Sequence, residues 1–133
     1  MDVFKVKGGN RLKGTIKVSG AKNSAVALIP AAILSDEEVT ICNVPNITDT
    51  TALCDILTYL DADIKRASES IVITSTHLKN KKITATYTKK LRASYYFMGA
   101  LLGKFQEVTM ALPGGCSIGA RPINLHLKGF EAL

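Results

Sequence analysis

The 133-residue sequence predicts an α/β fold, and three observations lead to that prediction. Short runs that are β-branched or alternate between apolar and polar residues, typical of strands, take turns along the chain with longer apolar helical patterns. Hydrophobic residues make up 47% of the chain, which is enough to bury one sizeable core. The order of the elements also recurs at an offset of about 70 residues. We therefore expect one globular piece without a linker between domains.

The strand and helix patterns follow one another in a regular order. Helical periodicity is expected over 22–34, where the sequence is apolar almost all round, and over 49–60, where Leu53, Ile56, Leu57 and Leu60 share one stripe. Two more helices are expected over about 89–102 and from 123 to the end. Strands are expected at 4–7, 15–18, 39–44, 61–66, 70–74, 82–86 and 108–112, with 61–66 and 70–74 forming a pair.

The repeat divides the chain into a first unit over about 13–75 and a second over about 82–133, by self-similarity at a fixed offset. It places Lys22 opposite Arg92, each at the start of a helix. The first unit ends in a strand pair, and the chain reaches Leu133 where the second unit would begin its own pair, so the second unit is expected to be truncated. A chance alignment of two α/β stretches is the alternative.

Charge and cysteine content restrict the class of protein. Lys and Arg number 17 against 11 Asp and Glu, a net charge of +6 that favours anionic partners. The three cysteines are widely spaced, so we expect neither a disulfide framework nor a metal site, and we expect Cys42 and Cys54 to be small core residues. The start of the chain lacks the apolar core of a signal peptide, and the longest apolar stretch, 25–34, contains Pro30 and is too short for a bilayer. We expect a cytoplasmic protein that binds no membrane and no cofactor.

The run 113–122 places Cys116 among three glycines, with Arg121 five residues on. Glycines let backbone amides face an anion, and such amides with a nearby guanidinium are expected to lower the pKa of the thiol. A thiolate near neutral pH suits nucleophilic or acid-base chemistry. The alternative is a surface loop with an incidental cysteine.

Cations at helix starts indicate an anion site. Lys22 and Arg92 are expected in first turns, where unpaired N–H groups favour anions, and Arg121 precedes the fourth helix. These positions suit a phosphate-bearing ligand, whereas ordinary solvated charges are the alternative. The lysines between 79 and 90, followed by Tyr95 and Tyr96, could form a nucleic-acid surface. Solvated lysines around a turn are the favoured interpretation, and no nucleic acid is expected.

Three segments carry a resemblance to a known family. They are Val18-Ser19-Gly20-Ala21-Lys22-Asn23, Leu91-Arg92-Ala93-Ser94 and 112–122, and they closely resemble motifs of the enolpyruvyl transferases that act on UDP-N-acetylglucosamine. The resemblance implies an inside-out α/β barrel of repeated βαβαββ units, of which this chain is an incomplete N-terminal part. The related 5-enolpyruvylshikimate-3-phosphate synthase shares that fold without the cysteine loop and is one alternative. A catalytically silent domain that binds a nucleotide sugar or a protein partner is another.

The resemblance also implies roles for individual residues. Cys116 is implied as the general acid that protonates phosphoenolpyruvate in peptidoglycan precursor synthesis, and as the target of fosfomycin. The residues implied to contact phosphoenolpyruvate are Lys22, Asn23 and Arg121, and those implied for UDP-N-acetylglucosamine are Arg92, Arg121, Pro122, Ile123, Asn124 and Leu125. Asn124 stands where the family commonly has aspartate, so uridine contacts are expected to be altered. The family's catalytic aspartate and closing arginine fall beyond Leu133, and the chain alone is expected to be inactive.

Overall fold

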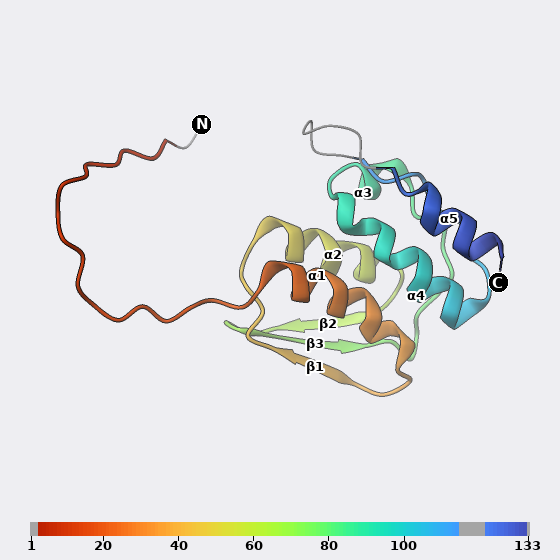
Figure 1. Ribbon diagram of the computed structural model, residues 1–133. Coiled ribbons are helices and arrows are strands. Elements are labelled where there is room, and N and C mark those ends of the chain that lie inside the picture. Colours follow the sequence, from red (N-terminus) through yellow and green to blue (C-terminus); the bar gives the residue numbers. More distant parts are fainter. Residues whose placement is uncertain (1–2, 115–121, 133) are drawn as a thin grey trace.

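A computed structural model describes residues 3–114 and 122–132 and confirms the α/β class (Figure 1). Helices and strands follow one another along the chain, with a long extended segment before the first helix. The elements are α1 (Lys22–Ala31), η1 (Ala32–Leu34), β1 (Val39–Cys42), α2 (Thr48–Tyr59), β2 (Asp63–Arg66), β3 (Ser70–Thr74), α3 (Ala85–Thr88), η2 (Arg92–Tyr95), α4 (Tyr96–Phe105) and α5 (Asn124–Glu131).

The strands form one antiparallel sheet in the order β1-β3-β2. β3 lies in the middle, where Ile73 is opposite both Val39 of β1 and Ile64 of β2. Burial alternates along β3, so that Ile71 and Ile73 point into the core while their neighbours are half-buried. The expected strands 61–66 and 70–74 are therefore confirmed as a pair.

Helices α1 and α2 cover one face of this sheet, and α1 packs against both α2 and α4 (Figure 1). The apolar stripe expected on α2 is confirmed, because Leu53, Ile56, Leu57 and the following Leu60 are all fully buried. Burying one such side chain contributes about 1.5 to 3 kcal/mol, so this stripe is a principal source of stability. The helix expected over 22–34 exists as α1 and η1, but it is not buried on all sides, because Leu28 is 51% exposed.

The strands expected at 4–7 and 15–18 are wrong. Residues 3–19 run extended without strand pairing among the described residues, and their apolar side chains are exposed, from 82% at Val18 to 96% at Phe4. An alternating pattern shows that a segment has an apolar face, but a strand also needs a neighbour that completes its hydrogen bonds. Within residues 3–114 and 122–132, no helix is long and apolar enough to cross a bilayer.

The second half also differs from expectation. The strand expected at 82–86 is wrong: Ile83 makes an isolated parallel bridge with Met110, and residues 85–88 form α3. The strand expected at 108–112 is reduced to that same bridge. The helix expected over 89–102 begins later, since Leu91 is buried in an extended conformation, and it continues to Gln106, whose left-handed backbone ends it.

Candidate anion-binding site

The first turn of α1 and the segment 89–96 enclose a cavity of about 550 Å³. The expected cations Lys22 and Arg92 both line it, together with Asn23, so the structure brings these three residues to one place. Lys22 and Asn23 lie in the first turn of α1, and Arg92 begins the turn that leads into α4. Because α1 packs against α4, the starts of these two helices face the same cavity. The full lining is Lys22, Asn23, Val26, Asp49, Lys89, Lys90, Leu91, Arg92, Ala93, Tyr95 and Tyr96.

Local structure leaves the start of α1 open to a ligand. Ala21 precedes the helix and offers no side chain to cap it, so the first-turn amides keep the capacity to bind an anion. Gly20 sits directly before it, and a Cβ there would collide with the carbonyl oxygen of Asn43 after β1. Only glycine allows this close approach, which fixes the direction from which the chain enters α1.

Lys22 is already paired with a carboxylate. Its Nζ lies 2.5 Å from Oδ2 of Asp49, which stands in the first turn of α2. The Lys22 side chain is 57% exposed and that of Asp49 is 21% exposed, so the pair lies at the rim of the cavity. The sequence analysis gave Asp49 no role; the only sequence signal was an acidic residue at a helix start, which is common for reasons of helix stability alone.

The glycine-rich run begins at the wall of the same cavity. The Gly114 N–H donates to the carbonyl oxygen of Thr88 over 2.9 Å, and the Thr88 hydroxyl donates to the carbonyl oxygen of Leu112 over 3.2 Å. A Cβ on Gly114 would lie 2.5 Å from Cα of Lys89, a cavity-lining residue. Cys116 and Arg121 lie outside the described residues. Buried Thr88 was missed by the sequence analysis, because no motif marks an anchor of this kind.

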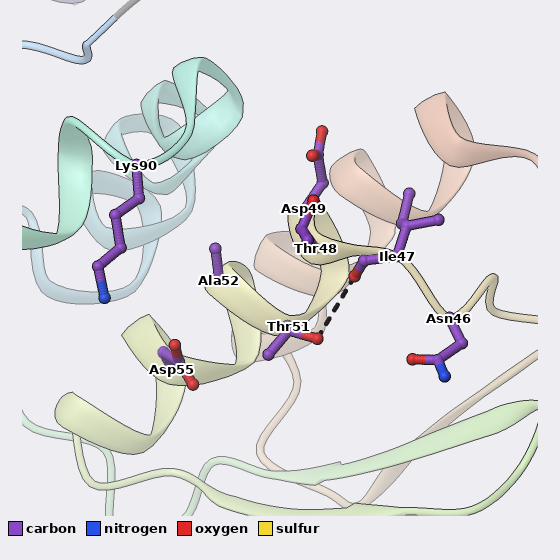
Figure 2. Close-up of a pocket in the computed structure, with 8 residues that line it drawn as sticks. All are labelled: Asn46, Ile47, Thr48, Asp49, Thr51, Ala52, Asp55 and Lys90. Atoms are coloured by element: carbon purple, nitrogen blue, oxygen red, sulfur yellow. Dashed lines mark hydrogen bonds between the residues drawn. The ribbon is translucent and has the colours of Figure 1, made fainter. Parts of the chain in front are cut away.

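A second cavity of about 440 Å³ adjoins the first (Figure 2). It shares Asp49 and Lys90 with the first cavity, so these two side chains stand between the two spaces. Figure 2 shows Lys90 across from the exposed side of α2, which carries Thr51, Ala52 and Asp55. Its complete lining is Asn46, Ile47, Thr48, Asp49, Thr51, Ala52, Asp55 and Lys90.

Aromatic rings connect the first cavity to α5. Tyr95 stacks on Tyr96 with ring centroids 4.5 Å apart, and it contacts the His126 ring at 5.4 Å. A hydrogen bond with Tyr96, together with burial, raises the pKa of the Tyr95 hydroxyl. Both tyrosines also line a small cavity of about 110 Å³ that includes Ile123. The other described residues expected at the nucleotide, Pro122, Asn124 and Leu125, are exposed on the surface.

The structure also describes the other two cysteines, Cys42 and Cys54. Cys42 is exposed, so its expected core position is wrong; it alternates along β1 with half-buried Ile41 and points outward. Cys54 is buried as expected, and burial raises the pKa of its thiol. Among residues 3–114 and 122–132, no cluster of three or more His, Cys, Asp or Glu side chains could hold a metal ion.

An α/β domain that gathers cations around helix starts at one cavity has the features of a protein that binds phosphate-bearing ligands. A family model described as EPSP synthase (3-phosphoshikimate 1-carboxyvinyltransferase) matches residues 6–133. The chain therefore belongs to this family of enolpyruvyl transferases. The crystal structure of the enolpyruvyl transferase NikO from Streptomyces tendae matches with a TM-score of 0.66 at 28% identity, over 74% of this chain and 23% of that one.

Relatives with higher identity carry a more particular name. Proteins named UDP-N-acetylglucosamine 1-carboxyvinyltransferase 2 from Geobacillus kaustophilus and Bacillus subtilis are 52% and 47% identical to this chain over all of its residues. A protein of the same name from Listeria monocytogenes is 49% identical over 96% of the chain. The chain spans 31%, 31% and 30% of the length of these relatives.

Proposed function

We propose that this chain is part of an enzyme that transfers the enolpyruvyl group of phosphoenolpyruvate to the 3-hydroxyl of UDP-N-acetylglucosamine and releases phosphate. The observation that carries the proposal is the joint placement of Lys22, Asn23 and Arg92 around one cavity, in a chain 52% identical to a protein named for this activity. By this proposal the reaction belongs to peptidoglycan precursor synthesis and takes place in the cytoplasm, and fosfomycin acts on the enzyme.

The chemistry assigns a task to each proposed residue. The sugar hydroxyl gives up its proton to a base, the catalytic aspartate that the family places beyond Leu133, as its oxygen adds to C2 of phosphoenolpyruvate, while Cys116 gives a proton to the methylene carbon C3. Phosphate then leaves C2 and a proton leaves C3 to a base, which restores the double bond. Lys22, Asn23 and Arg121 hold the phosphoenolpyruvate anion, and a fixed charged donor at such a place lowers the barrier by about 3 kcal/mol. Arg92 and residues 121–125 hold the UDP-sugar. We propose little turnover for the 133-residue chain by itself, because it spans about a third of its relatives.

Binding of UDP-N-acetylglucosamine to the 133-residue chain tests the proposal. Arg121→Ala is expected to weaken binding about 10- to 150-fold, since a charge-assisted hydrogen bond contributes about 1.5 to 3 kcal/mol. Lys79→Ala is the matched control, because Lys79 pairs with Asp61 over 2.9 Å and does not line the cavity. Calorimetric titration measures both variants. Equal small losses in both, with equal binding of unrelated polyanions, would refute a specific site.

The family contains a second acceptor, which the same titration can test. The description of the family model names 3-phosphoshikimate as the acceptor. The relatives at 47% to 52% identity are instead named for UDP-N-acetylglucosamine. We propose the nucleotide sugar as the acceptor, so shikimate 3-phosphate is expected to bind much more weakly. Tighter binding of shikimate 3-phosphate would reverse the assignment. Phosphate release from phosphoenolpyruvate with either acceptor provides the readout for turnover.

A further inference from the structure

Asp49 is the acidic residue that faces the proposed phosphoenolpyruvate site. It lies 2.5 Å from Nζ of Lys22, and its side chain stands between the two adjoining cavities. A ligand phosphate at Lys22 would therefore meet a carboxylate that is already bound to the same ammonium group. Two anions compete for one cation at this position.

The support beneath Asp49 is rigid. The neighbouring Thr50 is fully buried, and its hydroxyl shares its one hydrogen between the carbonyl oxygens of Ile47 and Pro45, at 2.8 and 3.0 Å. Arg66 of β2 donates from Nη2 to Oγ1 of Thr50 over 3.1 Å. The same guanidinium also donates to Asn46 and Thr51, which fixes the start of α2 against the sheet. These contacts hold the backbone that carries Asp49 against β2.

We propose that Asp49 is an internal counter-ion for Lys22, which competes with a bound phosphate group and thereby favours release of inorganic phosphate. The inference rests on the proposed function of Lys22. A fixed carboxylate repels a phosphate dianion more strongly than a monoanion of the same size, because the repulsion scales with the ligand charge. When phosphate leaves, the Lys22 ammonium returns to Asp49, so it is not left without a partner in the empty site.

Removal of this charge is expected to tighten phosphate binding. Asp49→Asn keeps the size of the side chain and removes the competing charge, so the dissociation constant for inorganic phosphate is expected to fall about two- to fivefold, the upper part of the range for a partly exposed ion pair. Asp49→Ser removes the same charge, suits a helix start, and serves as a second variant should the first not fold. Asp55→Asn is the control, because it removes one charge from an exposed position of the same helix.

The dissociation constants for inorganic phosphate are measured by titrating the 133-residue chain and its variants with phosphate at fixed salt. The NMR signals of the α1 amides report binding at each step of the titration. Tighter binding in both Asp49 variants, with less than a twofold change in Asp55→Asn, supports the proposal. Unchanged or weaker binding in the Asp49 variants overturns it, as does equal tightening in Asp55→Asn. Lys22→Gln distinguishes failure of the counter-ion role of Asp49 from failure of the proposed phosphoenolpyruvate site. If Lys22→Gln binds phosphate as well as the unmodified chain, the proposed phosphoenolpyruvate site itself is wrong.

Discussion

Gly114→Ala tests whether the start of the glycine-rich run is built onto the cavity wall. An added Cβ would lie 2.5 Å from Cα, 2.7 Å from the carbonyl oxygen and 2.9 Å from the carbonyl carbon of Lys89. All three atoms belong to the backbone, so no side-chain rotation can relieve the contact. The chain at 114 must therefore move away from Lys89.

The expected magnitude follows from the hydrogen bonds that this movement breaks. The Gly114 N–H donates to the carbonyl oxygen of Thr88, and the Thr88 hydroxyl donates to the carbonyl oxygen of Leu112. Movement of the chain at Gly114 would lengthen or break these two hydrogen bonds, both of which involve the buried residue Thr88. Each net bond contributes about 1 kcal/mol, and a buried group left unpaired costs about 1 to 3 kcal/mol. We expect a loss of about 1 to 3 kcal/mol in the free energy of unfolding, together with weaker binding of UDP-N-acetylglucosamine.

Urea denaturation followed by circular dichroism measures the stability, and calorimetry measures the binding. Gly14→Ala is the matched control, since a Cβ at Gly14 meets no atom within 4 Å. The control is expected to change stability by less than about 0.5 kcal/mol, as surface substitutions usually do. If Gly114→Ala were as stable as the control and bound the nucleotide sugar equally well, the anchoring role of Thr88 and Lys89 would be refuted.

Two further predictions concern titrating groups. Hydrogen bonds from two lysine ammonium groups hold the pKa of Asp61 below its ordinary value of 3.8, so its contribution to stability is present above pH 3.8 and is lost as the pH falls through the lower folded-state pKa. Asp61→Asn is expected to reduce the change in the free energy of unfolding with pH in that acid range. The same pH dependence in Asp61→Asn and in the unmodified chain would contradict a stabilising role of the Asp61 carboxylate. Iodoacetamide under native conditions is expected to label Cys116 first, exposed Cys42 more slowly and buried Cys54 least, as measured by peptide mapping. Faster labelling of Cys42 than of Cys116 would argue against an activated loop thiol.

Elements with a clear alternation of apolar and polar positions could be predicted from the sequence. The stripe on α2 and the pair of β2 and β3 were predicted because a period of 3.6 or 2 directly reports which residues face the core. The same reasoning placed Cys42 in a strand but on the wrong side of it, because a four-residue strand with two half-buried and two exposed positions has little contrast between its faces. The unit boundaries of the repeat stay a prediction.

Contacts between distant residues could not be predicted in this way. Local signals found Lys22 and Arg92, because a cation at a helix start has a meaning within its own turn. The pairing of Lys22 with Asp49 depends on how α1 packs against α2. The anchoring of Gly114 depends on Thr88, which lies between two expected elements and is marked by no motif. Both contacts exist only after the apolar faces of the helices have been brought together.

That dependence explains where the precision of the site comes from. Its polar groups belong to the starts of α1 and α2 and to the segment around Arg92. Their relative position is set by apolar packing, since α1 packs against both α2 and α4 and its Ile29 is fully buried in the core. Close-packed interiors resist small displacements, so the core holds the helix starts at fixed separations. By our proposal, the Lys22 ammonium exchanges its partner Asp49 for a ligand phosphate while this framework stays in place.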